Sequence, residues 1–273
     1  MQNSKPRYRV LLSFDLEEFD IPNEYGAALP IEEQLAVTQE GMKNLLPLLT
    51  QLNIPCTFFT TAFYAQENVA AMKSLAAAHE IASHSFYHSR FTNEDLLASR
   101  QVLAAITGQS IAGFRMPRLA PVDMALIRSA GYLYDASLHP TWLPGRYNHL
   151  GQPRTLFKNE GLWRMPSSVT PTLRLPLFWL AFKNLPLWFI QQCSLQVLKA
   201  DGYLSLYYHP WEYANLAGYH QLPLYIRRRS GEALLHKLRL YLQWLQTMAS
   251  FSSMETFIRE RETERAARAS NPI

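Results

Sequence analysis

The stretch LLSFDLEEFD, residues 11–20, begins as an apolar run and ends in acidic side chains. The apolar part is typical of a strand buried in a parallel sheet. The acidic residues follow within six positions: Asp15, Glu17, Glu18 and Asp20. Folding alone does not require this many carboxylates at a strand end, so we expect some of them to belong to a functional site.

Short apolar runs alternate with segments of helical periodicity along most of the chain. The expected strands are RVLLSF (9–14), CTFFTT (56–61), EIAS (80–83), YLYDAS (132–137) and YLSLYYH (203–209). The expected helices cover residues 31–52, 65–78, 93–107, 121–130 and 187–200. This alternation predicts an α/β protein with a mostly parallel sheet. In such a fold the carboxyl ends of the strands meet at one face, where ligands bind.

The length and the loop pattern favour a single domain over residues 1–273. The chain of 273 residues, 48% of them hydrophobic, can form a large core, and it has no repeat or low-complexity linker. Residues 138–161 are rich in Pro and Gly, which predicts a long loop. From about residue 255 the chain is highly charged, which predicts a C-terminal helix that frays at its end.

The charge balance is mildly basic, because 26 Lys and Arg residues against 22 Asp and Glu residues give a formal net charge of +4. This balance gives little reason to expect a nucleic-acid partner. The N-terminus lacks the apolar segment of a secretory signal, and the two cysteines lie in unrelated contexts, so we expect a cytoplasmic protein with reduced thiols. The most apolar region, residues 173–195, is interrupted too often to span a bilayer. We expect it to form core, or an apolar surface that meets a lipid-linked substrate.

A second informative stretch is HEIASHSFYH, in which His84 and His88 are four residues apart. On a helical turn this spacing places both imidazoles on one face, within reach of a single metal ion. Hydrolytic zinc sites commonly combine two His ligands with one carboxylate and leave a position open for water. The acidic end of the first strand would supply that carboxylate.

Strand geometry separates the candidate acids. If the strand stays extended through residue 17, Asp15 and Glu17 point to one side and Glu18 points to the other. Two carboxylates on the same side suit a division of labour, with one as metal ligand and one as general base.

The order of the segments SFDLEE, HSFYH, FRMPR, YDAS and SLYYHPWE resembles the five motifs of the polysaccharide deacetylase family with the NodB homology domain, also called carbohydrate esterase family 4. The resemblance spans about residues 8–212, and IPCTFFTT is similar to the second strand of the family. It implies a distorted (β/α) barrel with about seven parallel strands. It also implies a divalent metal, often zinc, and removal of N-acetyl groups from sugars.

Position by position, the resemblance implies that Asp15 is the general base and that His84 and His88 are metal ligands. The usual first motif has two adjacent Asp residues, but Leu16 occupies the second place here. Some members have an acid-x-acid spacing instead, and that variant makes Glu17 the metal carboxylate, with Glu18 as the reserve candidate.

The later motifs imply three further roles. Arg115 resembles the arginine that orients the base, Asp135 resembles the aspartate that supports the acid, and His209 resembles the general acid. Two positions depart from the pattern: Arg118 follows Pro in the third motif where an aromatic residue is usual, and Tyr207 stands two residues before the histidine where Leu is usual. Both departures alter the walls of the expected pocket.

The expected substrate is an N-acetylated sugar of a cell-surface glycan or of its nucleotide-linked or lipid-linked cytoplasmic precursor. Residues 173–195 and the arginines at 227–229 could make peripheral contact with a membrane. Two alternatives stay open: a metal-dependent amidohydrolase acting on a small cyclic amide or ureide, and a non-catalytic glycan-binding module. The sequence assigns neither the sugar nor the oligomeric state.

Overall fold

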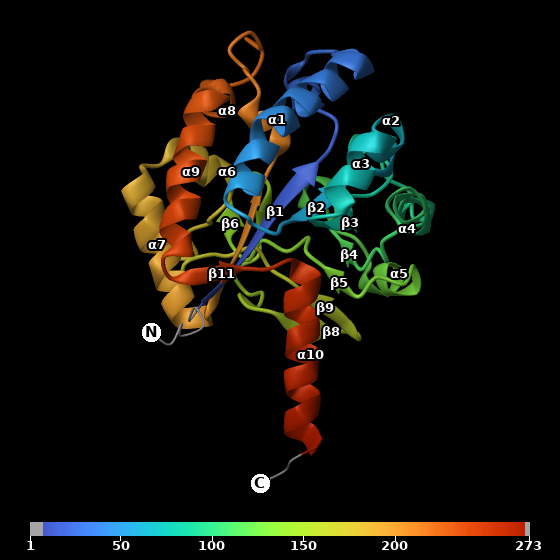
Figure 1. The fold of residues 1–273 in the computed structure, drawn as a ribbon, viewed down its shortest axis with the longest axis vertical. Helices are drawn as coiled ribbons and strands as arrows, with labels where there is room; N and C mark the ends of the chain where they lie inside the picture. Colours follow the sequence, from blue (N-terminus) through green and yellow to red (C-terminus); the bar gives the residue numbers. More distant parts are fainter. Residues whose placement is uncertain (1–7, 271–273) are drawn as a thin grey trace.

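The computed structural model describes residues 8–270, so the ends of the expected domain, 1–7 and 271–273, lie outside it. A curled sheet occupies the centre, and helices pack around its outer side (Figure 1). Its strands are β1 (Tyr8–Leu16), β2 (Thr57–Thr60), β3 (Glu80–Ser83), β4 (Gly113–Phe114), β5 (Tyr134–Asp135), β8 (Phe157–Asn159), β9 (Leu162–Arg164), β10 (Tyr203–Tyr208) and β11 (Ala249–Phe251).

Within the described residues the strand order is β10-β1-β2-β3-β4-β5-β9-β8, and β11 pairs with the first residues of β1. Neighbouring strands are parallel except for β8 and β9. The consecutive parallel strands from β10 to β9 form a distorted, incompletely closed barrel. The predicted α/β class and NodB-like barrel are therefore confirmed.

The helices follow the predicted periodicity closely. They are α1 (Ile31–Gln51), α2 (Ala62–Glu67), α3 (Val69–Ala76), α4 (Glu94–Thr107), α5 (Met124–Ser129), α6 (Trp179–Asn184), α7 (Leu187–Asp201), α8 (Leu224–Arg227), α9 (Glu232–Gln246) and α10 (Met254–Ser270). The helix predicted at 65–78 is two helices, because the backbone leaves the helical region at Asn68. Helix α9 was not predicted, although its buried side chains recur at helical spacing.

Strand β1 sets the position of the site because its two faces have different surroundings. Val10, Leu12 and Phe14 pack into the core cluster between sheet and helices. Leu11 lies on the other face, in the cluster inside the barrel, and Ser13 on the same face bonds to Arg115. The period of two therefore directs the odd-numbered residues of β1 toward the barrel interior.

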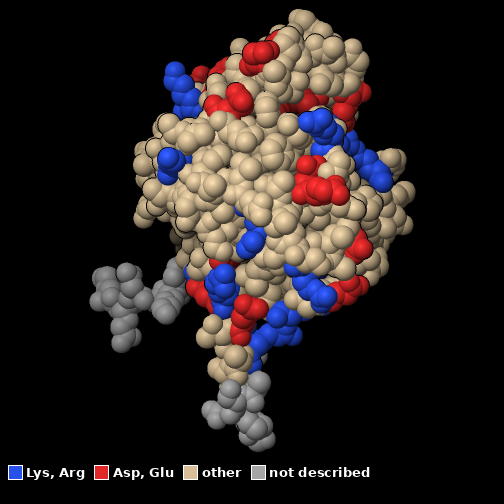
Figure 2. Space-filling model, turned by 90° about the vertical axis from the view of Figure 1, so that its right-hand side faces the viewer, with Lys and Arg blue, Asp and Glu red and all other residues tan. Residues whose placement is uncertain are grey.

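The region predicted as a loop, residues 138–161, contains a short hairpin and the edge strand β8. The hairpin strands are β6 (Trp142–Leu143) and β7 (Tyr147–Asn148). Near the C-terminus, α10 buries Met254, Phe257 and Ile258 and then projects away from the body of the molecule (Figure 1). On the face shown in Figure 2, basic and acidic side chains are interspersed around a broad uncharged area.

The apolar stretch 173–195 divides between core and surface. Phe182 and Ile190 are buried, whereas Leu173 and Trp188 are 74% and 65% exposed. No helix within residues 8–270 combines the length and the apolar character needed to cross a bilayer.

Candidate active site

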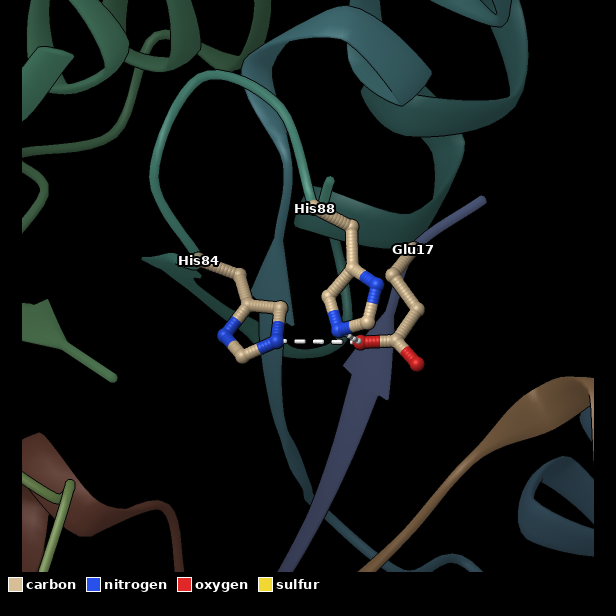
Figure 3. Close-up of side chains that lie close together, drawn as sticks. All are labelled: Glu17, His84 and His88. Carbon is tan, nitrogen blue, oxygen red and sulfur yellow. Dashed lines mark hydrogen bonds and ion pairs between the residues drawn. The ribbon is translucent and has the colours of Figure 1, made fainter. Parts of the chain in front are cut away.

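The end of β1 brings one carboxylate against both histidines of the HxxxH segment (Figure 3). Glu17 Oε2 lies 3.0 Å from His84 Nε2 and 3.1 Å from His88 Nε2. All three side chains are buried, and their ligand atoms lie within 4.8 Å of one another. In a tetrahedral site with bonds of about 2.0–2.1 Å, neighbouring ligand atoms lie about 3.3 Å apart. The group is therefore consistent with a site for a divalent metal.

The two histidines are not on a helix, which corrects the expected helical turn. Residues 84–88 form a loop after β3, and Ser85 adopts a left-handed conformation with φ 68°. Backbone bonds from Ala62 N to Ser85 O (3.0 Å) and from Phe63 N to Phe86 O (2.9 Å) fix this loop against the start of α2. The curled loop, not helical periodicity, brings the two imidazoles together.

The second ring nitrogen of each histidine has its own partner, which fixes the tautomer. His84 Nδ1 donates to the carbonyl oxygen of Arg115 at 2.8 Å, and His88 Nδ1 donates to Asp20 Oδ1 at 2.6 Å. Such partners are typical of metal-binding histidines, because they leave the lone pair of Nε2 free for the ion. Asp20, one of the four acidic residues at the end of the first strand, thus supports His88, and Arg118 Nη2 holds its other oxygen at 2.9 Å.

The charges of this group depend on one another. Burial alone would raise the pKa of Glu17, but the positive charges of His88 and His209 outweigh it and lower that pKa. Burial alone would lower the pKa of His88, but the Glu17 and Asp20 carboxylates raise it to about 9. A metal that binds here at neutral pH must therefore displace a proton from His88.

Glu18 points to the other side of the strand end. Its Oε2 accepts a hydrogen bond from Thr61 Oγ1 at 2.9 Å, and burial raises the pKa of Glu18. The structure therefore places Glu17 with the histidines and Glu18 with Thr61, as the alternation along the strand predicted.

A rigid arginine holds Asp15 beside this group. Arg115 Nη1 lies 2.5 Å from Asp15 Oδ1, and the guanidinium also donates to Ser13 Oγ at 3.0 Å and to the Ala136 carbonyl at 3.2 Å. Its charge centre lies 3.9 Å from the centroid of the Phe59 ring. Because Arg115 is fixed on several sides, it fixes the direction of the Asp15 carboxylate.

His209, at the end of β10, faces the same point from the opposite side. Its Nε2 lies 3.9 Å from Asp15 Oδ2 and 3.9 Å from Glu17 Oε1. The Trp211 ring stacks on the imidazole with centroids 4.7 Å apart, and Trp211 Nε1 donates to Glu17 Oε1 at 3.1 Å. Burial would lower the pKa of His209, but Glu17 and then Glu212 raise it.

The carboxylate in contact with the His209 ring is Glu212, not Asp135, which corrects the expected support for the acid. Glu212 Oε1 lies 3.3 Å from His209 Nδ1, and its Oε2 lies 3.3 Å from the ammonium group of the buried Lys183. Asp135 pairs instead with Arg164 at 2.7 Å and accepts a hydrogen bond from Ser137. The 3-10 helix η3 (Pro210–Tyr213) turns the chain after His209, so the residue three positions later reaches the ring.

Comparison with known proteins agrees with this geometry. The model of the family described as polysaccharide deacetylase matches residues 3–134. This range includes the group of Glu17, His84 and His88, and also Asp15 and Arg115. Over these residues, just under half of the chain, the sequence is similar to the polysaccharide deacetylase family. No curated protein sequence matches the chain.

Solved structures show the same fold at low sequence identity. A Mycobacterium smegmatis protein assigned to the polysaccharide deacetylases is 17% identical with a TM-score of 0.66, over 97% of this chain and 93% of that one. A similarly assigned protein from Pseudomonas aeruginosa PAO1 is 18% identical with a TM-score of 0.65, over 93% and 90%. PuuE allantoinase is 19% identical with a TM-score of 0.61, over 94% and 91%.

The group of Glu17, His84 and His88 lies in a cavity of about 250 Å³. Its lining includes Asp15, Glu17 and His209 together with an aromatic wall. The aromatic residues are Tyr25, Tyr147, Phe178, Trp179, Tyr207, Trp211 and Tyr225. A pocket with an apolar wall and a few convergent polar groups is the usual form of a small-ligand site.

Proposed function

We propose that this protein is a metal-dependent hydrolase that removes N-acetyl groups from an N-acetylated sugar of a cell-surface glycan or its precursor. The observation that carries the proposal is the convergence of three functions in one buried cavity. Glu17 and two histidines can hold a cation, Asp15 is aimed by Arg115, and His209 faces both carboxylates.

The donor set of two nitrogens and one carboxylate oxygen suits zinc, with one position left open. When bound, such a metal supplies a Lewis acid for the acetamide carbonyl and acidifies a water molecule. Asp15 would act as the general base toward a water molecule in the cavity, because its carboxylate is held toward the cavity by Arg115. His209 Nε2 gives a proton to the departing amine nitrogen, and Glu212 beside Nδ1 stabilises the positively charged ring.

Hydrolysis of a small cyclic amide or ureide is the second candidate. It uses the same bond chemistry, and a cavity of about 250 Å³ is small enough to favour a compact substrate. The likeness to PuuE allantoinase extends to the fold. A non-catalytic glycan-binding module is less well supported, since binding alone does not require Asp15 to be clamped by a buried arginine.

Three variants test the division of labour among the acids. Glu17→Gln should lose bound metal, because it removes the charged ligand shared by both histidines. Glu18→Gln is the matched control and should keep its metal. Asp15→Asn should keep metal but hydrolyse at least about 100-fold more slowly, because general-base catalysis typically contributes that much.

The measurements are elemental analysis of each purified variant and acetate release. Substrates should include nucleotide-linked, lipid-linked and oligomeric N-acetyl sugars, with cyclic imides as the competing class. If Glu18→Gln lost its metal and Glu17→Gln kept it, the assignment of Glu17 as the metal ligand would be contradicted. Turnover of cyclic imides without acetate release would favour the second candidate.

A further inference from the structure

The mouth of the cavity is surrounded by segments that are distant in the sequence. Four segments contribute residues to the cavity lining. They are the 3-10 helix η1 (Ile21–Tyr25), the hairpin β6–β7 and the short helices α6 and α8. We call these four segments the rim. Whether the rim is open at two ends or continuous decides which substrates can reach the buried ligand atoms.

The first half of the rim is joined by hydrogen bonds. Tyr25 of η1 and Tyr225 of α8 lie with their hydroxyl oxygens 3.1 Å apart. Helix α8 is in turn tied to α6, because Asn184 Nδ2 donates to the Tyr225 carbonyl at 2.9 Å and Lys183 Nζ donates to the Ile226 carbonyl at 2.8 Å.

The second half of the rim returns to η1. Phe178, directly before α6, packs on His139 with ring centroids 5.1 Å apart, and His139 Nδ1 lies 2.9 Å from the Tyr147 hydroxyl of the hairpin. Arg146 of the same hairpin then pairs with Glu24 of η1 at 3.3 Å. With the buried His139 as the link between Phe178 and the hairpin, the contacts form a closed ring of connected segments.

Glu24 has a second partner that reinforces its position. Arg118 Nε lies 2.6 Å from Glu24 Oε1, while Arg118 also holds Asp20 below it. Two neighbouring residues of η1, Glu24 and Tyr25, thus make the connections to the hairpin and to α8. They are the residues through which the ring closes.

Building on the proposed function, we propose that this ring restricts the enzyme to a single N-acylated unit or a chain end, with Glu24 and Tyr25 as specificity-determining residues. An internal unit of a polymer carries chain on both sides and needs a groove open at two ends. Here neighbouring rim segments are joined directly, except that α6 reaches the hairpin through the buried His139. Glu17, His84 and His88 lie below them with no more than 8% exposure. A substrate must therefore enter through the mouth by one end.

The test uses access to the metal and does not depend on knowing the sugar. Protein loaded with Co²⁺ is titrated with acetohydroxamate and with poly(acrylohydroxamic acid), whose metal-binding groups hang from the middle of a chain. The visible absorption band of Co²⁺ reports binding. Wild type should bind acetohydroxamate at least about 100-fold more tightly per hydroxamate than the polymer, because the ring excludes the backbone.

Opening the ring should reduce this preference. Glu24→Ala/Tyr25→Ala should lower the ratio of acetohydroxamate affinity to polymer affinity by about tenfold or more. Exposed ion pairs and hydroxyl contacts are individually weak, so both residues are changed together to remove the connections of η1. Glu24→Gln/Tyr25→Phe removes the charge of the Glu24 ion pairs and the Tyr25 hydroxyl contact with little change in size, and it serves if the first variant is unstable. The matched control is Glu33→Ala/Tyr219→Phe, which removes a similar exposed bond of 3.0 Å outside the cavity lining and should leave the ratio unchanged.

The outcomes separate this proposal from the proposed function. Failure of wild type to bind Co²⁺ at the site would contradict the metal-dependent function itself. A Co²⁺-loaded protein that binds both ligands equally, or excludes acetohydroxamate as well, would overturn the ring proposal alone. So would ring variants that exclude the polymer as strongly as wild type.

Discussion

Glu212 lies between two basic side chains with no exposure to solvent. It contacts the His209 ring on one side and the Lys183 ammonium group on the other, and Lys183 is itself fully buried. Burial would raise the pKa of Glu212, but the positive charge of Lys183 and the contacts with His209 together outweigh it and lower that pKa. Each charge is acceptable inside the protein because the other is present.

Neutralising only one of these charges should therefore be costly. Glu212→Gln leaves Lys183 buried without a counter-charge and should lower the free energy of unfolding by about 3–5 kcal/mol. The double variant Lys183→Met/Glu212→Gln removes both charges and should recover most of that loss. Denaturant unfolding of the single and double variants measures this coupling, and costs that simply add would show that the pair is not mutually stabilised.

Single residues also show where sequence reasoning reaches its limit. The strand period separated Glu17 from Glu18 because both lie on one continuous backbone segment. Asp20 and Glu212 were not assigned their contacts, since the partners His88 and Lys183 come from other segments of the chain. Only the folded chain brings those side chains together.

Among the secondary-structure elements, the contact of α1 with η3 positions the second half of the site. Gly41 of α1 lies against the backbone directly after His209. A Cβ atom at Gly41 would come within 1.9 Å of the Pro210 carbonyl oxygen and 2.5 Å of its carbon. The missing side chain therefore allows α1 to approach η3 closely.

Gly41→Ala should displace η3 and, with it, His209 and Trp211. We expect a loss of about 1–3 kcal/mol in the free energy of unfolding, as for other overpacked sites, and a lower kcat. Gly218→Ala is the matched control, because a Cβ there meets nothing within 4 Å. Equal stability and activity of the two variants would contradict the close packing of α1 on η3.

At the scale of the whole molecule, the barrel interior contains a histidine that cannot easily become charged. His139 is fully buried and packs against Phe178 and Tyr207, with its Nδ1 on the Tyr147 hydroxyl. Burial, with a smaller contribution from neighbouring positive charges, lowers the pKa of His139 to about 3.

This lowered pKa makes stability depend on pH. Between pH 6.5 and about 3 the unfolded chain binds a proton at His139 and the folded chain does not, so stability falls as the pH is lowered through that window. The contribution is about 1.4 kcal/mol per pH unit. The His139→Gln variant lacks this pH-dependent contribution. As the pH is lowered from 6.5 to 5, the free energy of unfolding of the variant should therefore fall less steeply than that of wild type. Parallel curves for the two proteins would contradict a neutral, buried His139.

The sequence by itself determined the α/β class, most helix and strand positions, and the side of β1 on which Asp15 and Glu17 lie. These features follow from periodicity, which is a local property of the chain. Tertiary structure decided what depends on distant segments: the curled loop that brings His84 to His88, the replacement of Asp135 by Glu212 beside His209, and the ring around the mouth. The physical reason is that these interactions depend on the distance between side chains in the folded protein, and the spacing of residues in the sequence does not determine that distance.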